Sequence, residues 1–333
     1  MTGTGIFDTV VIGGGAAGLS GATALGRARR SVLVIDAGEP RNAPADGVHN
    51  FLTRDGMNPL ALQAAGRAEA EAYGVRFLNS TATGASGGVG DFTVTLADGD
   101  RVRARRLLVT TGVTDILPDV AGLRDRWGRD VIHCPYCHGW EVRDRAIAVI
   151  GSGPMTMHQA LLFRQWSANV TLFVHTAPAP TQDEREQLAA RGIRLIEGLV
   201  TSVDVTDDAI SGVTTADGRT EPAAAVVVGP RMEARSGVLA DLGLTPIEHS
   251  SGVGTHIQSQ QGGVTSVPGV WVAGNVTDLV AQVVTAASAG LMAGATINAD
   301  LLAEELADDL ARYRARGPYQ QTPQPMFEPD RFA

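Results

Sequence analysis

The feature that most constrains the fold of this chain is a glycine-rich turn close to its N-terminus, within Asp8-Thr-Val-Val-Ile-Gly-Gly-Gly-Ala-Ala-Gly-Leu19. An apolar run enters a G-x-G-x-x-G turn, a small-residue helical pattern follows, and a second apolar run over 31–35 ends at Asp36. Strand, turn, helix, strand and acid in this order are typical of a dinucleotide-binding βαβ unit. The sequence therefore predicts an α/β fold of the Rossmann-like type.

Each glycine of this turn has a separate physical role. Gly13 permits the tight turn, Gly15 lets the backbone approach a pyrophosphate, and Gly18 allows the helix and the strand to pack closely. Amides at the helix N-terminus can donate to the phosphates, and a carboxylate after the second strand can accept from a ribose hydroxyl. The residues expected to contact the cofactor here are Gly13, Gly15, Ala16, Ala17, Gly18 and Asp36.

A second copy of the same plan follows the first. In the first copy, a hairpin signal at 98–99 leads into a strand pattern that ends at 111–112. In the second copy, the apolar run 146–150 enters a glycine turn, a hairpin signal recurs at 216–218, and an apolar run ends within 226–229. An internal repeat of this kind predicts two Rossmann-like domains in one chain.

The order of the segments predicts that one domain is inserted into the other. The late apolar pattern over 267–275 and the small-residue helical pattern after it complete the first copy and do not continue the second. We therefore expect a split first domain over 1–117 and 245–315. The inserted domain over 118–244 would carry both cysteines, and a proline-rich tail would occupy 316–333.

Bulk composition disfavours two classes of partner. The formal net charge is −9 and the isoelectric point is near 5.3, which disfavours binding to a nucleic-acid backbone. No uncharged apolar run reaches the roughly 18 residues of a membrane span. The first residues also lack the basic and apolar regions of a secretory signal. We expect a cytoplasmic protein with neither a membrane nor a nucleic acid as its partner.

Both cysteines of the chain lie in the stretch His133-Cys-Pro-Tyr-Cys-His-Gly-Trp-Glu141. They could form a structural bridge, hold a metal ion or exchange electrons. Structural bridges are unusual in a reducing compartment. Zinc sites usually join two separated ligand pairs, and outside this stretch the chain has no cysteine and no paired histidines at metal spacing. We therefore expect no metal, and a thiol pair that works as a two-electron switch.

Together these motifs resemble the low-molecular-weight thioredoxin reductase family of flavoproteins over residues 6–312. The resemblance implies FAD in the split domain, a pyridine-nucleotide domain inserted into it, and a homodimer. Two pairs of residues that the resemblance places at the cofactor could have a simpler role. Residues 41–42 could form a surface turn, and residues 49–50 could form a loop that only packs nearby. The further cofactor contacts expected are Arg41, Asn42, His49, Asn50, Thr111, Gly112, Gly274, Asn275, Gln282 and Val283.

Several departures from the family pattern affect the nicotinamide site and the redox pair. His138 follows the second cysteine, where the reductases carry an acid, and Asn275 replaces their usual aspartate. No arginine or lysine lies between Arg164 and Arg185 to hold the 2′-phosphate of NADPH. The inserted glycine turn carries Pro154. The use of NAD(P)H is therefore in doubt.

The C-x-x-C-His-Gly motif is similar to that of the family's flavin-dependent dithiol oxidases, which close disulfides in natural products such as gliotoxin, holomycin and romidepsin. That likeness implies that Cys134 exchanges disulfides with the substrate, that Cys137 faces the flavin, and that His138 is the acid or base. His133 could share that role, with a structural role as the alternative.

The predicted reaction is the oxidation of a small-molecule dithiol by O₂, with release of H₂O₂. The alternatives are a disulfide or thioredoxin reductase driven by NAD(P)H or another donor, and a flavin redox sensor without turnover.

Overall fold

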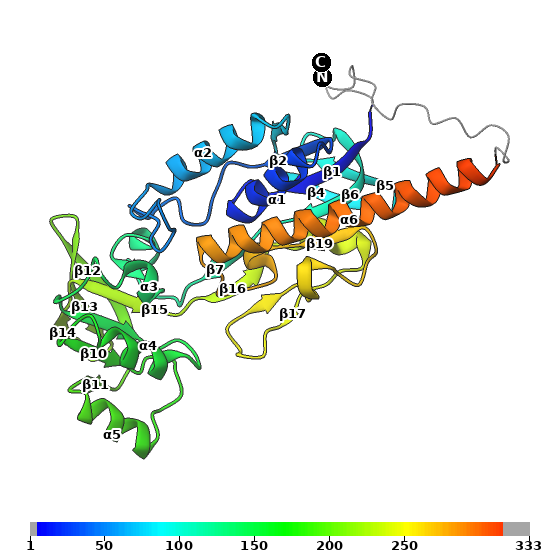
Figure 1. The fold of residues 1–333 in the computed structure, drawn as a ribbon. Coiled ribbons are helices and arrows are strands. Elements are labelled where there is room, and N and C mark those ends of the chain that lie inside the picture. The colour runs from blue at the N-terminus through cyan, green and yellow to red at the C-terminus, as the bar shows by residue number, and fades with distance from the viewer. Residues whose placement is uncertain (1–4, 316–333) are drawn as a thin grey trace.

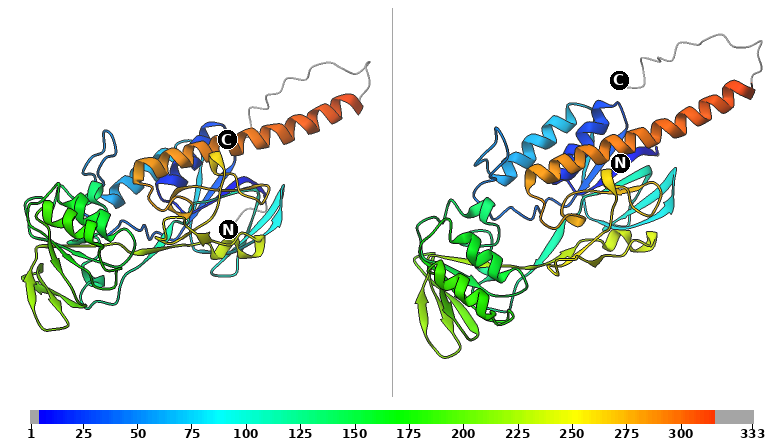
Figure 2. Two further views of the ribbon diagram at one scale, coloured as in Figure 1. Left: turned by 90° about the horizontal axis from the view of Figure 1, so that it is seen from below. Right: turned by 60° about the horizontal axis from the view of Figure 1, so that its bottom comes forward.

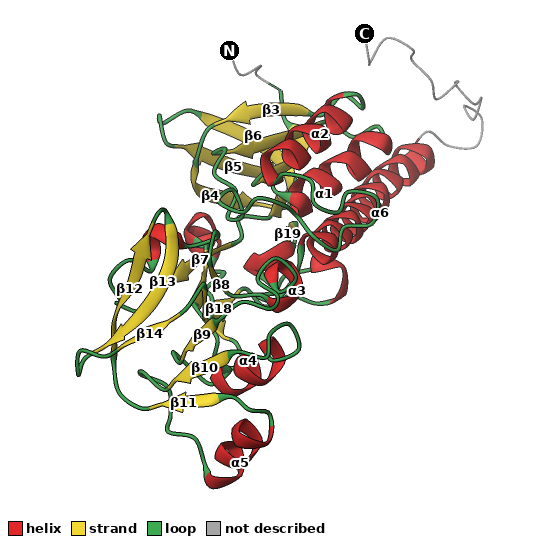
Figure 3. Ribbon diagram, turned by 90° about the vertical axis from the view of Figure 1, so that its left-hand side faces the viewer, coloured by secondary structure: helices red, strands yellow, loops and turns green. Residues whose placement is uncertain are grey.

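The computed structural model describes residues 5–315 and consists of two α/β lobes joined by two extended strands (Figure 1). The predicted tail, 316–333, lies outside the described residues. Figure 3 shows the lobes one above the other, with a separate sheet in each. Within residues 5–315, no helix is both long enough and apolar enough to cross a bilayer.

The first lobe is built on a seven-stranded sheet with the order β3-β2-β1-β6-β5-β4 and with β19 paired to β6. Strands β3, β2, β1, β6 and β19 run parallel, whereas β4 and β5 are antiparallel additions at one edge. The late strand thus completes the first sheet, as the sequence predicted. The strands are β1 (Phe7–Ile12), β2 (Val32–Asp36), β3 (Arg76–Asn79), β4 (Ala82–Gly88), β5 (Asp91–Leu96), β6 (Arg101–Val109) and β19 (Val270–Val272).

In the described part of the chain, three α-helices belong to this lobe: α1 (Ala16–Arg27), α2 (Pro59–Glu71) and α6 (Val283–Ala315). Helix α6 packs along α1 and then extends beyond the body of the lobe (Figures 1 and 2). Glycines permit this close contact, because a Cβ atom on Gly290 would lie 1.9 Å from the carbonyl oxygen of Ala17. The glycine- and alanine-rich composition of both helices therefore sets how closely they approach.

The second lobe repeats the plan of the first. Its sheet has the order β11-β10-β9-β15-β8, so that β11-β10-β9-β15 corresponds to β3-β2-β1-β6. A separate three-stranded antiparallel sheet, β12-β13-β14, lies between β11 and β15 in the chain, as β4 and β5 lie between β3 and β6. This arrangement confirms the predicted duplication. The elements are β8 (Val131–Ile132), α3 (Pro135–His138), β9 (Ile147–Ile150), α4 (Thr156–Phe163), β10 (Val170–Phe173), α5 (Gln182–Ala190), β11 (Arg194–Ile196), β12 (Val200–Thr206), β13 (Ala209–Thr215), β14 (Thr220–Pro222) and β15 (Ala225–Val228).

Two antiparallel strands connect the lobes, β7 (Val113–Ile116) and β16 (Arg231–Ala234). After β16 the chain enters the core of the first sheet, where Val238, Leu239 and Leu244 are buried against its strands. The chain therefore returns to the first lobe before the expected domain boundary at 244/245, because these apolar side chains are buried in the core of that lobe. Two short strands follow, β17 (Ile247–Glu248) and β18 (Thr255–His256).

Candidate active site

A cavity of about 1150 Å³ runs from the first glycine turn to the cysteine pair, with walls from both lobes. Its lining includes the turn at 13–17, the acid Asp36, and the segments 110–113 and 274–275. At the other end lie residues 131–138 of the second lobe. The predicted dinucleotide site and the predicted redox pair therefore line one continuous cavity, although they lie far apart in the sequence.

The three glycines of the turn lack side chains for different reasons. A Cβ atom on Gly13, whose φ is +104°, would lie 2.5 Å from the carbonyl oxygen of Thr110, and one on Gly18 would lie 1.9 Å from that of Gly13. Gly15 has an ordinary φ of −75°, and no described atom lies within 4 Å of its Cβ position. Because packing and backbone geometry do not require glycine there, the open space at Gly15 fits the approach of a ligand such as the pyrophosphate of FAD.

Asp36 holds the turn as well as lining the cavity. Its carboxylate accepts the Gly14 amide at 2.9 Å and the Gln63 side-chain amide at 3.1 Å. Gln63 also donates to the carbonyl oxygen of Gly14 at 3.1 Å. Sequence reasoning missed Gln63, because it lies in α2, which carries no motif. Its approach to the turn depends on how that helix packs.

The residues after the acid are partly engaged by the protein itself. Arg41 forms a bidentate ion pair with Asp115, at 2.7 and 2.6 Å, and both residues line the cavity together with Asn42. The Thr111 hydroxyl, also at the cavity, donates to the carbonyl oxygen of Arg235 at 2.6 Å. The ion pair and this hydrogen bond both tie the connecting strands to the cavity.

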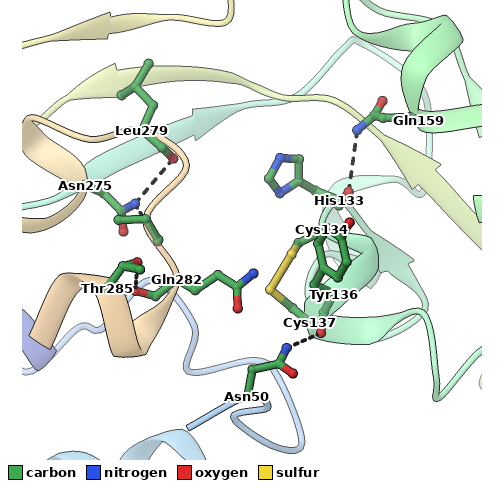
Figure 4. The surroundings of a disulfide bond; sticks show 11 residues. Asn50, His133, Cys134, Tyr136, Cys137, Gln159, Asn275, Leu279, Gln282 and Thr285 are labelled. Carbon is green, nitrogen blue, oxygen red and sulfur yellow. Dashed lines mark hydrogen bonds between the residues drawn. A yellow bond between two sulfur atoms is a disulfide. The ribbon is translucent and has the colours of Figure 1, made fainter. Parts of the chain in front are cut away.

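Cys134 and Cys137 are joined by a disulfide that lies at the cavity wall, with their Cα atoms 5.2 Å apart (Figure 4). Helix α3 is a single turn that starts at Pro135, and Cys134 is its N-cap residue. Proline suits the first helical position because its missing N–H group has no partner to lose there. The Gln282 side chain points toward the disulfide from the start of α6 (Figure 4). Both cysteines of this turn therefore line the same cavity.

The two histidines beside the cysteines are surrounded by protein. Burial lowers the pKa of His133 to about 4, and the positive charge of Arg41 adds to the effect. Burial also lowers the pKa of His138, although the negative charge of Glu141 opposes part of the shift. Both imidazoles are therefore neutral at pH 7, the form in which they accept a proton.

Asn275 supports the loop that leads into α6. Its side-chain amide donates to the carbonyl oxygens of Asp278, Leu279 and Ala281, at 3.0, 3.3 and 3.0 Å. A carboxylate has no hydrogen atoms to donate, so an aspartate could not make these bonds. The departure from the family pattern therefore has a structural reason. Gly274, Asn275, Gln282 and Val283 all line the cavity, as their predicted role requires.

His49 and Asn50, which were expected at the flavin, are not part of the cavity lining. The Asn50 side-chain amide instead donates to the carbonyl oxygen of Tyr136 at 2.7 Å. The His49 ring lies between two carboxylates, with its nitrogens 3.5 Å from Asp55 and 3.5 Å from Glu141. The side chains of this loop therefore contact the cysteine segment, because the loop reaches across to the second lobe.

The glycine turn of the second lobe is closely packed at Gly151 but open at Gly153, where no described atom lies within 4 Å of a Cβ position. A Cβ atom on Gly151 would lie 2.4 Å from the carbonyl oxygen of Val174, and the Thr176 amide donates to the Gly151 carbonyl at 3.1 Å. The His175 ring accepts the Val200 amide at 3.0 Å, and burial lowers its pKa. A neutral histidine cannot supply the positive charge that a 2′-phosphate requires.

Metal binding finds no support in the geometry. Within residues 5–315, no group of three or more His, Cys, Asp or Glu side chains is arranged to hold a metal ion. The sulfur atoms of the cysteine pair are bonded to each other. The site therefore combines a dinucleotide-sized cavity with a disulfide and neutral histidines.

The sequence and the fold of this chain are similar to those of several known proteins. The family model for pyridine nucleotide-disulphide oxidoreductases matches residues 7–290. Thioredoxin reductase sirT of Leptosphaeria maculans is 32% identical over 306 residues, which are 87% of this chain and 92% of that protein. The crystal structure of HlmI is 43% identical with a TM-score of 0.88, and the match covers 95% of this chain and 98% of that one. An oxidoreductase from Agrobacterium tumefaciens is 37% identical with a TM-score of 0.85, over 90% and 99% of the two chains.

Proposed function

The chain belongs to the pyridine nucleotide-disulphide oxidoreductase family and has the thioredoxin reductase-like fold, and from this premise we propose that it is an FAD-dependent dithiol oxidase. Enzymes of this family typically bind FAD. The proposed reaction oxidises a small-molecule dithiol to a disulfide and reduces O₂ to H₂O₂. Two electrons and two protons leave the dithiol, and both pairs end in the peroxide.

The observation that carries this proposal is the shared cavity. The disulfide lies on the wall of the same space as the first glycine turn, so electrons from a thiol substrate can reach a cofactor bound there without a change of fold. The second glycine turn, where a nicotinamide nucleotide would bind, has Thr156 in place of the third glycine, and the sequence has no arginine or lysine between Arg164 and Arg185 to hold a phosphate. These features favour thiols over NAD(P)H as the electron source.

FAD fits the residues of the first lobe. The open space at Gly15 would admit the pyrophosphate, the amides at the start of α1 would donate to it, and Asp36 would face the ribose. The loop 274–283 would border the flavin ring. When bound, FAD supplies the two-electron acceptor that links a dithiol to O₂.

The protein's own residues perform the thiol chemistry. Neutral His138 accepts the proton of the first substrate thiol, and the resulting thiolate attacks the sulfur of Cys134. The Cys134–Cys137 bond breaks, a mixed disulfide forms, and Cys137 leaves as a thiolate facing the cavity. The second substrate thiol then attacks the mixed disulfide, which releases the oxidised product and leaves both cysteines reduced.

Anaerobic bleaching of the flavin absorbance tests the proposal directly. The purified protein is mixed with dithiothreitol, NADPH or NADH in separate experiments. We expect rapid bleaching by the dithiol alone and, under air, one H₂O₂ for each dithiol oxidised. Rapid bleaching by NADPH or NADH with no effect of the dithiol would overturn the assignment.

A disulfide reductase is the second candidate, favoured by the names of relatives such as the thioredoxin reductase from Leptosphaeria maculans and by the retained second sheet. It would reduce a protein disulfide and would depend on an external electron donor. The bleaching experiment separates the two, because only the reductase needs a nicotinamide nucleotide or another donor to reduce its flavin. In either case we propose a homodimer, which light scattering at several protein concentrations can check.

A further inference from the structure

A hairpin of the first lobe reaches the cysteine segment of the second. The hairpin spans residues 48–57 and is closed by hydrogen bonds from the Val48 amide to the Met57 carbonyl and from the Gly56 amide to the Val48 carbonyl, both at 2.8 Å. Across its tip, the amide of Asn50 donates to the Asp55 carboxylate at 2.9 Å. These bonds give the tip a defined shape, although Asn50 itself is exposed.

Asn50 is held in an uncommon backbone conformation. Its φ is +61°, in the left-handed region that asparagine tolerates better than most residues other than glycine. In this conformation its side-chain amide donates to the Tyr136 carbonyl oxygen at 2.7 Å (Figure 4). Because α3 is a single turn, this carbonyl is among those that a helix end leaves without an intrahelical donor. The bond therefore gives this carbonyl a partner from the first lobe.

The position of this bond matters for the redox pair. The carbonyl group of Tyr136 and the amide nitrogen of Cys137 belong to one planar peptide unit. A hydrogen-bond donor that fixes the direction of the Tyr136 carbonyl also fixes the orientation of this peptide plane. The Cα atom of Cys137, which carries the side chain, is bonded to that plane. The neighbouring His49 ring lies 3.5 Å from the Glu141 carboxylate, which is a second contact between the hairpin and the cysteine segment.

We propose that Asn50 is a positioning residue, which clamps the cysteine turn against the first lobe and keeps the Cys137 sulfur at the cavity wall. The inference rests on the proposed function in one respect, since it takes the flavin as the electron acceptor of Cys137. Without the clamp, α3 is anchored to the first lobe less firmly, and the sulfur occupies the geometry for electron transfer for a smaller fraction of the time.

Two variants remove the donor in different ways. Asn50→Gly deletes the side chain and accepts the positive φ without strain. Asn50→Asp keeps the size of the side chain but has no hydrogen to donate. Thr53→Gly is the matched control, because Thr53 has a φ of +71° in the same hairpin. Within residues 5–315, no hydrogen bond joins the Thr53 side chain to the cysteine segment.

Single-turnover reduction of the flavin by dithiothreitol gives the first measurement. Dithiothreitol reduces the Cys134–Cys137 bond and becomes a cyclic disulfide, and the two electrons then pass to FAD. We expect both Asn50 variants to bleach about 3- to 10-fold more slowly, which corresponds to the loss of one hydrogen bond. The dithiol concentration for half-maximal rate and the FAD content should be unchanged, and Thr53→Gly should match the wild type.

Hydrogen exchange of the protein as purified gives a second measurement that does not depend on turnover. The amides of His138 and Gly139 bond to the carbonyls of Cys134 and Pro135, and we expect them to exchange faster in both Asn50 variants. Wild-type bleaching rates together with wild-type exchange would refute the clamp. If dithiothreitol fails to bleach even the wild type, the proposed function fails instead, and the exchange rates alone decide whether the clamp exists.

Discussion

At the scale of single residues, the proposed function makes the histidines beside the disulfide the groups that accept a thiol proton. Burial keeps the pKa of His138 below its ordinary range, so the imidazole is neutral at pH 7. As the pH falls through that lowered pKa, His138 becomes protonated and can no longer act as a base. The oxidation rate should therefore have an acidic limb that lies below pH 6.5.

Replacing His138 tests this assignment. We expect His138→Ala to slow flavin reduction by a dithiol about 10²- to 10⁴-fold and to remove the acidic limb of the pH profile. The measurement is anaerobic bleaching between pH 5 and pH 8. An unchanged limb in the variant would transfer the proton-accepting role to another residue.

His133 should affect stability against pH. Its pKa is about 4 in the folded protein, below the value of about 6.5 for an exposed imidazole. Between these values the unfolded chain binds more protons, so stability is lost as the pH falls from about 6.5 toward 4. We expect the thermal midpoint of His133→Gln to fall less steeply than that of the wild type across this window, as followed by circular dichroism.

Asn275 gives a prediction that depends on hydrogen-bond polarity. Asn275→Asp restores the family's usual residue but points a carboxylate at three carbonyl oxygens. We expect a loss of about 1–3 kcal/mol in the free energy of unfolding, since acceptors would face each other at pH 7. Asn275→Ala, which removes the donors without adding charge, should cost less. Thermal unfolding of both variants would check this, and equal stability would contradict it.

At the scale of elements, two glycines contribute to the site in opposite ways. Gly290 lets α6 touch α1, and a methyl group there would meet the backbone of Ala17. Gly15 faces open space. Gly290→Ala should therefore lower the thermal midpoint of the protein freed of cofactor, because the helices must move apart.

Gly15→Ala should leave that midpoint unchanged but weaken FAD binding, as a titration of the apoprotein followed by flavin fluorescence would measure. The two variants are matched controls for each other, because each adds one methyl group. Unweakened FAD binding by Gly15→Ala would mean that the pyrophosphate does not approach the backbone there.

At the scale of the whole molecule, the duplication gives two glycine turns, which differ in the residues available to hold a nucleotide. In the second lobe, Thr156 stands where the first turn has Gly18, its hydroxyl donates to the Gly153 carbonyl at 2.7 Å, and burial lowers the pKa of His175. We expect neither NADPH nor NADH to raise the thermal midpoint, whereas added FAD should raise that of the apoprotein. A shift with NADPH comparable to that with FAD would show that the second site still binds a nucleotide.

The sequence alone determined the architecture, because strand, glycine turn and strand recur twice along it and each recurrence has one low-energy fold. It also determined the disulfide, since a C-x-x-C turn brings its two sulfur atoms together within four residues. Tertiary structure decided everything that depends on contacts between distant segments. Examples are the Gln63 bond to the turn, the Asn50 bond to Tyr136, and the early return of Val238 to the first core. No local pattern encodes such contacts, because they arise only when the packed lobes bring these side chains within hydrogen-bonding or van der Waals distance.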